Sequence, residues 1–578
     1  MISEKRHSLA HLLGDAIIKL KPSALLTIGP AVENGFYYDV DLQGETLSLD
    51  DLPKLTEIMK TTIATWSTFT PTTLTTTEAE ELFKNNKYKL ELIADIAKNG
   101  EAITTYTSGE FTDLCKGGHV ENMNQIENDS WVLDRISGAY WRGNENNTML
   151  TRVYGIAFDT KDELDTFLSN RELAKERDHR KLGKELGLFV FSDLVGSGLP
   201  LYTPKGSYLR NKIADFSREL NQECGYLEVN TPNMNKAELF KVSGHYDKYK
   251  EDMFEVHSHY SDDEFFLKPM NCPQHTQIFA SEPRSYRDLP IKYADFAMLY
   301  RDERPGELSG LTRARAFAQD DGHAFCTEDQ LEDEFILVLN AIKKALTTYG
   351  FKYHIRLSLH DPAEKEKYLG DASVWEKAEG LLRKLLEKLE IPFVEGIGEA
   401  AFYGPKMDIM AVDALGREWQ ISTIQVDFNQ PVRFKLEYKD KDGQLKTPIM
   451  IHRALIGSLE RFMALAIEHY GGAFPLWMSP THAAIIPVGE SHKEFAEGIQ
   501  KQMRAAGMNV ELLMDDSLGK RIRQAKTEKT PYAIVVGDKE MESGKLTIEL
   551  RTGDKQEMAA DEFVQHVQNL ISTRSREL

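Results

Sequence analysis

Hydrophobic and polar positions repeat with different periods along the chain, and these periods predict where helices and strands lie. Residues 3–20 place apolar side chains at helical spacing, which predicts an amphipathic helix. Residues 206–232 begin with a second amphipathic helix and continue after Gly225 as a short strand. Many strands joined by hairpin-like turns favour an antiparallel sheet. These strands are expected around 263–269, 291–301, 313–326, 352–358, 407–413 and 417–428.

The C-terminal segment has a simpler pattern, in which strands and helices alternate. Apolar runs in THAAIIPVG, MNVELLMDD and PYAIVVGDKE alternate with helical stretches, which predicts a small α/β domain. A charged stretch with a helical period precedes the central part and is typical of a linker. We therefore predict an α+β multidomain protein. Its parts are an α+β domain at 1–160, a linker helix at 161–187, an antiparallel-sheet domain at 188–478 and an α/β domain at 479–578.

Composition narrows the class of protein. The 578 residues are 41% hydrophobic, with no run of eighteen apolar residues and no secretory signal layout. We therefore expect a cytoplasmic protein without a membrane span. Four cysteines in a chain of this length exclude a disulfide framework. The net charge of −21 argues against nonspecific nucleic-acid binding but permits a local basic track. KRIRQAKTEK has five basic residues in ten, although one face of a solvated helix is the usual interpretation of a single charged run. No P-loop, glycine-rich dinucleotide fingerprint or HExxH motif occurs.

One predicted strand carries an unusual set of side chains. In RARAFAQDDGHAF (313–325), arginine, phenylalanine, glutamine, aspartate and histidine occupy alternate positions and so share one face. Buried charges need partners, and the other face is mostly alanine rather than bulky apolar residues. We interpret the charged face as the lining of a cavity for a polar ligand. Arginine suits phosphate and an aromatic ring suits a stacked base. The alternative is a salt-bridged hairpin on the surface.

Ordered motifs over essentially the whole chain resemble those of one enzyme family. YRDERPGELSGLTRAR (300–315) resembles motif 2 of class II aminoacyl-tRNA synthetases, GSLERF (457–462) resembles motif 3, and the helix and strand of 206–232 resemble motif 1. Other segments are similar to those of threonyl-tRNA synthetases, including RHSLAH, DLCKGGH, SGAYWRG, LKPMNCPQH, AFYGPKMD, QISTIQVDF and PIMIHRALIGSLERF. The resemblance implies an editing domain, a class II antiparallel-sheet core and a C-terminal anticodon-binding domain. The family usually begins with another small domain, which we expect this protein to lack.

The resemblance implies a threonine–tRNA ligase, which activates threonine with ATP and transfers it to tRNA(Thr). In this interpretation Arg301 holds the α-phosphate, Arg313 the γ-phosphate and Arg461 the triphosphate from the other side, with Mg²⁺ accompanying ATP. Glu303 would face the adenine edge and Phe317 would stack on the base. The implied ATP set also contains Gln420 and Ser458. Lys406 and His245 are implied catalytic residues, His245 assisting proton removal near the tRNA 3′ end, and Gln319, Asp321, Tyr403 and Gln425 are implied threonine-binding residues.

The resemblance also implies one Zn²⁺ per subunit, bound by Cys272, His323 and His452. Sequence spacing does not identify this trio, and alone it would pair Cys272 with His275. One thiolate and two imidazoles leave an open zinc position. The amino and hydroxyl groups of threonine could coordinate there, whereas valine has no hydroxyl.

Serine differs from threonine by one methyl group, which a binding site discriminates weakly, so a threonine enzyme needs a second site. HxxxH at 7–11 and CxxxH at 115–119 resemble the editing domain of threonyl and alanyl enzymes. For an isolated HxxxH, solvated histidines are the alternative. The resemblance implies hydrolysis of seryl-tRNA through an activated water without a metal, although the residue types also suit a metal. The implied editing set is His7, His11, Lys89, Asp113, Cys115 and His119.

The C-terminal domain and the quaternary structure follow from the same resemblance. Glu542 and Arg551 match positions near the anticodon, and Glu549 replaces an arginine found in some bacterial members. We expect a homodimer through the motif 1 surface. One competing hypothesis is an inactive RNA-binding paralogue, but Arg301, Arg461 and the metal trio are present. Another is a stand-alone aminoacyl-tRNA hydrolase, against which the intact synthetase core argues.

Overall fold

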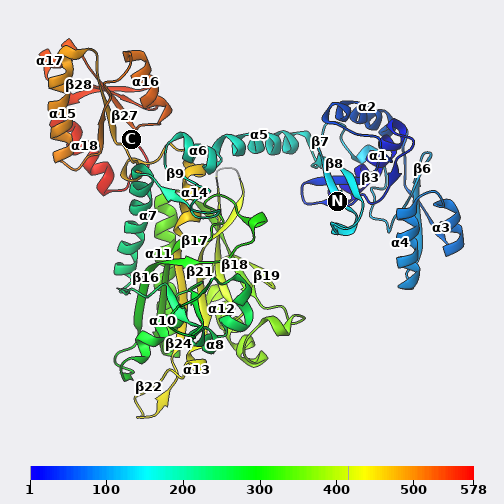
Figure 1. Ribbon diagram of the computed structural model, residues 1–578, viewed down its shortest axis with the longest axis horizontal. Coiled ribbons are helices and arrows are strands. Elements are labelled where there is room, and N and C mark those ends of the chain that lie inside the picture. The colour runs from blue at the N-terminus through cyan, green and yellow to red at the C-terminus, as the bar shows by residue number, and fades with distance from the viewer. Residues whose placement is uncertain (1, 414–415) are drawn as a thin grey trace. The chain divides into compact units, whose positions relative to one another are not determined.

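The structure is a computed structural model that describes residues 2–413 and 416–578 (Figure 1). It contains two compact units, the first ending at Glu172 and the second spanning Leu173–Leu578. Among the residues described, none of the helices has the length and apolar content that crossing a membrane requires.

Helix α1 (Ile2–Leu20) lies against a sheet with the order β1-β3-β8-β7, in which β2 also pairs with β3. Most of its apolar stripe is fully buried, and α2 (Leu52–Ile63) packs beside it. The other side of α1 is covered as well, since His11 is only 2% exposed and its ring contacts Phe69 and Phe111. This helix is therefore more buried than its amphipathic pattern predicts. The strands are β1 (Leu25–Leu26), β2 (Ala31–Val32), β3 (Gly35–Asp41), β7 (Trp131–Tyr140) and β8 (Met149–Ala157).

A smaller antiparallel sheet completes the first unit. Its strands have the order β4-β5-β6, and β6 ends directly before the CxxxH segment. The elements are β4 (Thr70–Leu74), α3 (Thr76–Leu82), α4 (Lys87–Lys98), β5 (Ile103–Ser108) and β6 (Phe111–Leu114).

The predicted linker segment contains two helices, α5 (Lys161–Arg177) and α6 (His179–Glu185), instead of one. Asp178 interrupts the helix with φ −49° and ψ 123°. Its carboxylate accepts a hydrogen bond from the backbone N–H of Arg180 at 2.8 Å. An aspartate at this N-cap position stabilises the start of the second helix.

The second unit is built around an eight-stranded sheet with the order β11-β16-β17-β24-β21-β20-β18-β19. All inner neighbours are antiparallel, and only the two edge pairs are parallel. The predicted antiparallel core is thus confirmed. Helices α7 (Pro204–Glu223), α11 (Leu331–Tyr349) and α14 (Leu459–Tyr470) contribute to its hydrophobic core. The strands are β11 (Leu227–Glu228), β16 (Ile291–Tyr300), β17 (Ala316–Cys326), β18 (Lys352–Leu359), β19 (Phe393–Ile397), β20 (Lys406–Val412), β21 (Glu418–Asp427) and β24 (Ile449–Ser458).

The strand predicted at 313–326 begins later than the sequence pattern indicates. β17 starts at Ala316, so Arg313 and Arg315 precede it. The backbone of Arg315 instead bonds to Gly198 and Arg301, and its guanidinium donates to the carbonyl oxygen of Glu303 at 3.0 Å. Arg315 therefore holds the motif 2 loop by hydrogen bonds to its backbone. It does not line the cavity, so its predicted place on the cavity face was wrong.

The C-terminal part of the second unit is a five-stranded sheet with the order β26-β25-β27-β28-β29. The first three strands pair in parallel, and their alternation with helices confirms the predicted α/β pattern. The hairpin β28–β29 and helix α17 were not predicted. The elements are β25 (Ala483–Pro487), α15 (Lys493–Ala505), β26 (Val510–Leu512), α16 (Leu518–Thr527), β27 (Tyr532–Val536), α17 (Asp538–Ser543), β28 (Lys545–Leu550), β29 (Lys555–Ala559) and α18 (Ala560–Ser572).

Candidate functional site

A cavity of about 340 Å³ opens over the eight-stranded sheet. Strands β17, β20, β21 and β24, the start of α14 and the motif 2 loop contribute its lining. The structure brings nearly all of the predicted active-site residues into this one cavity. They are Arg301, Glu303, Arg313, Phe317, Gln319, Asp321, Tyr403, Lys406, Gln420, Gln425, Ser458 and Arg461, together with Cys272, His323 and His452.

One end of the cavity is strongly cationic. Burial lowers the pKa of Arg461, and the nearby Arg301 and Arg313 lower it further. Nε of Arg301 is buried with no hydrogen-bond partner among the described residues. The Arg301 guanidinium also lies 5.1 Å from the centroid of the Phe317 ring. Guanidinium groups that lower the pKa of Arg461 also favour a bound anion beside it, and phosphate matches their geometry.

Arg313 and Glu303 are bonded to each other in this structure. Nε of Arg313 donates to Oε2 of Glu303 at 2.7 Å, and its Nη2 lies 2.9 Å from Oε2 of Glu307. Arg313 is nearly half exposed. A phosphate that binds Arg313 must therefore compete with two carboxylates.

The other end of the cavity contains the Cys–His–His trio. Cys272 begins helix α10 (Cys272–Ala280), while His323 on β17 and His452 on β24 are directly paired in the sheet register. All three side chains are buried, and their donor atoms lie within 4.8 Å of one another. A thiol and two imidazoles in this arrangement are suitable ligands for a metal such as zinc.

Two residues outside the trio orient its imidazoles, and neither was singled out as a site residue by the sequence analysis. Nε2 of His452 lies 2.9 Å from Oδ2 of Asp427, and Nδ1 of His323 lies 2.7 Å from Nδ1 of His275. His275, which spacing alone would have paired with Cys272, therefore lies behind His323. An acidic residue at the end of the apolar strand β21 was the available sequence signal for Asp427.

Lys406 is held by a carboxylate that the sequence analysis also missed. The fully buried Asp408 accepts hydrogen bonds from Lys406 at 2.7 Å, Ser358 at 2.8 Å, Gln420 at 2.7 Å and Thr423 at 2.8 Å. Asp408 therefore fixes the side chains of two predicted site residues. A lone aspartate within the apolar strand KMDIMAV was the signal that could have identified it.

His245 lies behind the cavity lining. Its Nδ1 is 2.8 Å from Oγ of Ser243, and its Nε2 is 3.3 Å from Sδ of Met270 and 3.8 Å from Sγ of Cys272. Burial lowers the pKa of His245 to about 3, so its imidazole is neutral at physiological pH. Both sulfur-containing neighbours, Met270 and Cys272, line the cavity, whereas His245 is not among the lining residues.

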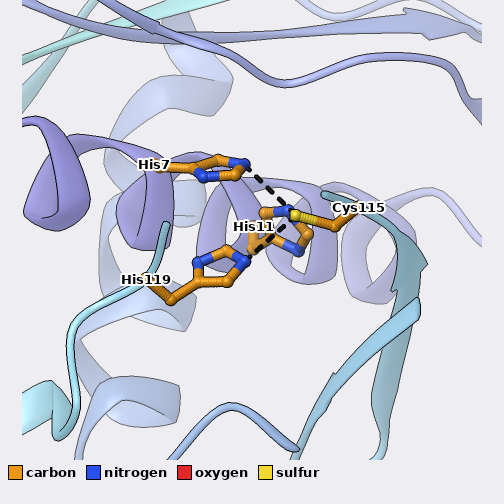
Figure 2. A group of neighbouring side chains, drawn as sticks. All are labelled: His7, His11, Cys115 and His119. Carbon is orange, nitrogen blue, oxygen red and sulfur yellow. Dashed lines mark hydrogen bonds between the residues drawn. The ribbon is translucent and has the colours of Figure 1, made fainter. Parts of the chain in front are cut away.

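A second cluster of reactive side chains lies in the first unit (Figure 2). His7 and His11 project from α1, and Cys115 and His119 come from the segment that follows β6. Sγ of Cys115 is 3.6 Å from Nε2 of His7 and 3.2 Å from Nε2 of His119. The two predicted four-residue pairs thus form one cluster, and they are not solvated surface histidines.

Two glycines shape the loop that returns His119 to Cys115. Gly117 and Gly118 have φ of +99° and +87°, which favour glycine. A Cβ on Gly117 would also lie 2.6 Å from the hydroxyl of Tyr106. The backbone N–H of Gly117 donates to Sγ of Cys115 at 3.2 Å.

Burial sets the protonation of the cluster. It lowers the pKa of His7, lowers that of His11 well below its usual range and lowers that of His119 to about 2. It raises the pKa of the Cys115 thiol to about 11. At neutral pH the cluster therefore holds three neutral imidazoles and one thiol.

Lys89 and Asp113 form a buried ion pair in the same unit. Nζ of Lys89 is 2.5 Å from Oδ1 of Asp113, and the hydroxyl of Tyr38 donates to Oδ2 of Asp113. Asp113 lies on β6, two residues before Cys115, which directly follows the strand. This pair therefore anchors the strand that presents the cysteine.

Only one of the two predicted anticodon residues lines a pocket of the C-terminal domain. Arg551 lines a pocket of about 500 Å³ with Lys526 and Glu549, and its Nη1 donates to the carbonyl oxygen of Phe474 at 2.7 Å. Glu549 pairs with Lys526 at 2.9 Å. Glu542 is exposed on α17 and does not line this pocket.

Comparison with family models gives three matches that follow the chain order. Residues 103–154 match the second additional domain of threonyl and alanyl tRNA synthetases. Residues 254–470 match the class II tRNA synthetase core domain for G, H, P, S and T. Residues 482–570 match an anticodon-binding domain.

Close relatives extend the similarity over almost the full chain. A threonine–tRNA ligase of Rubrobacter xylanophilus is 46% identical and covers 98% of this chain and 89% of its own. A threonine–tRNA ligase of Thermotoga maritima is 43% identical and covers 99% of this chain and 89% of its own. Among solved structures, an RNA-binding domain of threonyl-tRNA synthetase from Cryptosporidium parvum has a TM-score of 0.65 and 38% identity, covering 68% of this chain and 98% of that chain.

Proposed function

Because the chain belongs to the threonyl-tRNA synthetases, a family of class II aminoacyl-tRNA synthetases, we propose how its residues carry out that family's reaction. It is a threonine–tRNA ligase with an editing domain. The residue-level proposal rests on one observation, the convergence of three arginines and a Cys–His–His trio in one cavity. We assign editing to residues 1–160, a linker to 161–187, catalysis to 188–478 and anticodon binding to 479–578.

In the activation step, the carboxylate of threonine attacks the α-phosphorus of ATP, and pyrophosphate leaves as threonyl-adenylate forms. The protein contributes positioning and charge stabilisation. Arg301 holds the α-phosphate, Arg313 the γ-phosphate and Arg461 the triphosphate from the opposite side. The unpaired Nε of Arg301 supports this assignment. Mg²⁺ accompanies ATP, whose adenine stacks on Phe317 and faces Glu303 once Arg313 has left that carboxylate.

Cys272, His323 and His452 would hold one Zn²⁺ per subunit. The donor set suits zinc, and the contact of Asp427 with Nε2 of His452 leaves Nδ1 available as a ligand. The zinc supplies, when bound, a Lewis-acid position that selects an amino acid with a hydroxyl group. Asp321 supplies a buried carboxylate for the ammonium group of threonine.

Further side chains complete the threonine and transfer sites. Gln319, Tyr403 and Gln425 line the threonine end, and Lys406 is held toward the cavity by Asp408. Gln420 and Ser458 contribute to the ATP site. We assign His245 to proton removal during transfer to tRNA, because its imidazole lies 3.3 Å from Met270, a residue of the cavity lining.

The cluster of His7, His11, Cys115 and His119 hydrolyses seryl-tRNA. Its neutral imidazoles can accept a proton from an attacking water, which then cleaves the ester between serine and the ribose. The Lys89–Asp113 pair positions β6 and thereby Cys115.

The partners follow from the division into domains. The enzyme binds tRNA(Thr), with Arg551 and Glu542 near the anticodon, and it acts in the cytoplasm, where the tRNA is charged. We assign a homodimer interface to the surface of α7 and β11. Leu227 on the edge strand β11 is 67% exposed, next to a pocket lined by Phe296 and Tyr226. A second copy would cover these apolar groups.

Amino-acid-dependent ATP–pyrophosphate exchange tests the synthetic site. With zinc-loaded protein, we expect strong exchange with threonine, weaker exchange with serine, and none with valine or proline. The absence of exchange with all four would contradict the assigned active site and favour an RNA-binding protein without ligase activity.

A further inference from the structure

We propose that His179, at the start of the linker helix α6, is a positioning residue that holds the motif 2 loop in its ATP-binding form from outside the cavity. His179 is buried and is not among the residues that line the cavity. Its imidazole Nε2 accepts a hydrogen bond from the backbone N–H of Leu311 at 3.0 Å. Leu311 belongs to the motif 2 loop and is itself buried. The consequence for ATP rests on the phosphate-binding role proposed above for this loop.

The bonded N–H group lies at the centre of a tight turn. Ser309 and Arg313 close this turn, because the backbone N–H of each donates to the carbonyl oxygen of the other, at 3.1 and 3.3 Å. The carbonyl oxygen of Thr312, the residue after Leu311, accepts a hydrogen bond from Nε of Arg461 at 3.1 Å. Holding Leu311 therefore fixes both the turn that carries Arg313 and the carbonyl group that orients Arg461.

The turn passes directly over the imidazole of His179. Gly310 has a φ of +51°, a conformation that favours glycine. A Cβ on Gly310 would lie 2.3 Å from Nε2 of His179 and 2.8 Å from Cγ of Arg180. The loop and the start of α6 are therefore fitted closely to each other, and a side chain at position 310 would push them apart.

Glu468 fixes the imidazole in the tautomer that this contact needs. Oε1 of Glu468, on α14, lies 2.7 Å from Nδ1 of His179 and accepts the backbone N–H of His179 at 3.1 Å. Because a carboxylate oxygen accepts hydrogen bonds, Nδ1 carries the proton, and Nε2 keeps a lone pair for the N–H of Leu311. The other oxygen of Glu468 accepts from Arg417, which holds the carboxylate in place.

Loss of the imidazole would loosen the loop without removing any group that touches ATP. Because Leu311 is buried, water does not readily replace His179, and its N–H would be left without an acceptor. The loop would then occupy its binding form for a smaller fraction of the time. KM for ATP would rise by the factor by which that fraction falls, whereas saturating ATP would restore the loop and with it kcat.

Two substitutions of His179 separate its two side-chain hydrogen bonds. Asparagine can donate to Glu468 as Nδ1 does but is too short to reach Leu311, whereas the side-chain oxygen of glutamine can take the place of Nε2. In threonine-dependent ATP–pyrophosphate exchange, we expect His179→Asn to raise KM for ATP about tenfold, with kcat and KM for threonine within about twofold. His179→Gln should keep KM for ATP within about threefold of the unsubstituted value.

Lys184→Gln is the control, because it changes an exposed residue of the same helix and should alter none of these constants. An unchanged KM for ATP in His179→Asn, or an equal rise in both His179 variants, would overturn the proposal. A loss confined to kcat would also overturn it, since that result would indicate a general structural role.

Hydrogen exchange of the backbone amides tests the contact in the absence of ATP. Peptides spanning 305–315 are analysed by mass spectrometry after exchange of the full chain. The amide of Leu311 should exchange at least about tenfold faster in His179→Asn than in the unsubstituted protein, and His179→Gln should keep the protection. Equal exchange in all three proteins would overturn the contact between His179 and the loop.

Arg313→Ala separates the role of His179 from the ATP assignment. If Arg313→Ala leaves KM for ATP unchanged, the phosphate-binding role of the loop fails together with the consequence for ATP. Exchange of the Leu311 amide then decides whether His179 holds the loop. If Arg313→Ala raises KM for ATP and His179→Asn does not, the ATP assignment stands and the positioning role of His179 fails.

Discussion

At the scale of single residues, carboxylates outside the predicted sets orient the catalytic side chains. Asp427 contacts His452, and Asp408 receives hydrogen bonds from Lys406, Gln420 and two further hydroxyl groups. Such outer contacts fix the direction of a ligand or a cation and thereby tune its chemistry. We therefore expect substitutions one layer away from the cavity to affect zinc binding and catalysis.

Asp427→Asn should weaken zinc binding about 10- to 100-fold, the usual effect of removing an outer-shell partner. The amide oxygen is a weaker acceptor than the carboxylate for Nε2–H of His452. Zinc affinity measured by competition with a chelator, with threonine-dependent exchange alongside, tests this. Asp442→Asn is the control, since Asp442 is exposed and lies outside the cavity lining. An unchanged zinc affinity would remove Asp427 from its positioning role.

At the scale of elements, the side chain of Asp320 replaces part of the backbone hydrogen bonding between β17 and β24. The register of these strands shifts between Gln319 and Asp321. There Oδ2 of Asp320 accepts from the backbone N–H groups of Leu455 at 2.9 Å and Ile456 at 3.0 Å, and Oδ1 accepts from Gly457 at 3.0 Å. This carboxylate therefore joins the strand of motif 2 to the strand that leads into motif 3.

Asp320→Asn should destabilise the second unit by about 1–3 kcal/mol, because an amide NH₂ cannot accept a hydrogen bond from a buried N–H. Urea unfolding followed by fluorescence measures this change. Ser217→Ala, which removes one donor to Oδ2 of Asp320, is the milder comparison. If Asp320→Asn unfolded at the same urea concentration as Ser217→Ala, the pairing of β17 with β24 would not depend on the carboxylate.

The loop after β6 permits a selective test of the editing cluster. Gly117→Ala places a Cβ 2.6 Å from the Tyr106 hydroxyl at a φ of +99°, so the loop must move. We expect hydrolysis of seryl-tRNA to fall at least tenfold, while threonine-dependent exchange in the second unit stays unchanged. Gly100→Ala is the matched control, with φ of +71° but no atom within 4 Å of the added Cβ. Equal losses in both variants would mean that backbone strain, and not the contact with Tyr106, matters.

At the scale of the whole molecule, two kinds of chemistry occupy different compact units. The cavity with its arginines lies in Leu173–Leu578, and the His–Cys cluster lies in the unit that ends at Glu172. Variants of one unit should therefore leave the chemistry of the other intact. Quaternary structure is the remaining property at this scale.

Leu227→Lys should convert the proposed homodimer to a monomer, because a charge on the exposed face of β11 would be desolvated in the interface. Sedimentation equilibrium would show the mass fall to one chain. Leu445→Lys is the control, because Leu445 is 64% exposed on a strand outside the motif 1 surface. A Leu227→Lys protein that remains dimeric would place the interface elsewhere.

The sequence by itself determined the class of each domain and most of the cavity residues. Periodic apolar positions specify helices and strands because side-chain direction follows backbone period, and ordered motifs gave Arg301, Phe317 and Arg461. The alternation of residue types could not predict where β17 starts, because the hydrogen bonds of Arg315 to Gly198 and Glu303 end the strand pairing there. It also could not give the break at Asp178 within a charged helical stretch.

Only the tertiary structure decided which distant side chains meet. His275 is three residues from Cys272 in sequence, yet it contacts His323 from behind. His452 follows His323 by 129 residues and lies beside it. Likewise, the separate HxxxH and CxxxH pairs become one cluster only when the loop after β6 folds against α1. Local period constrains the direction of a side chain along its own element, but long-range packing sets its neighbours, and those neighbours decide its chemistry.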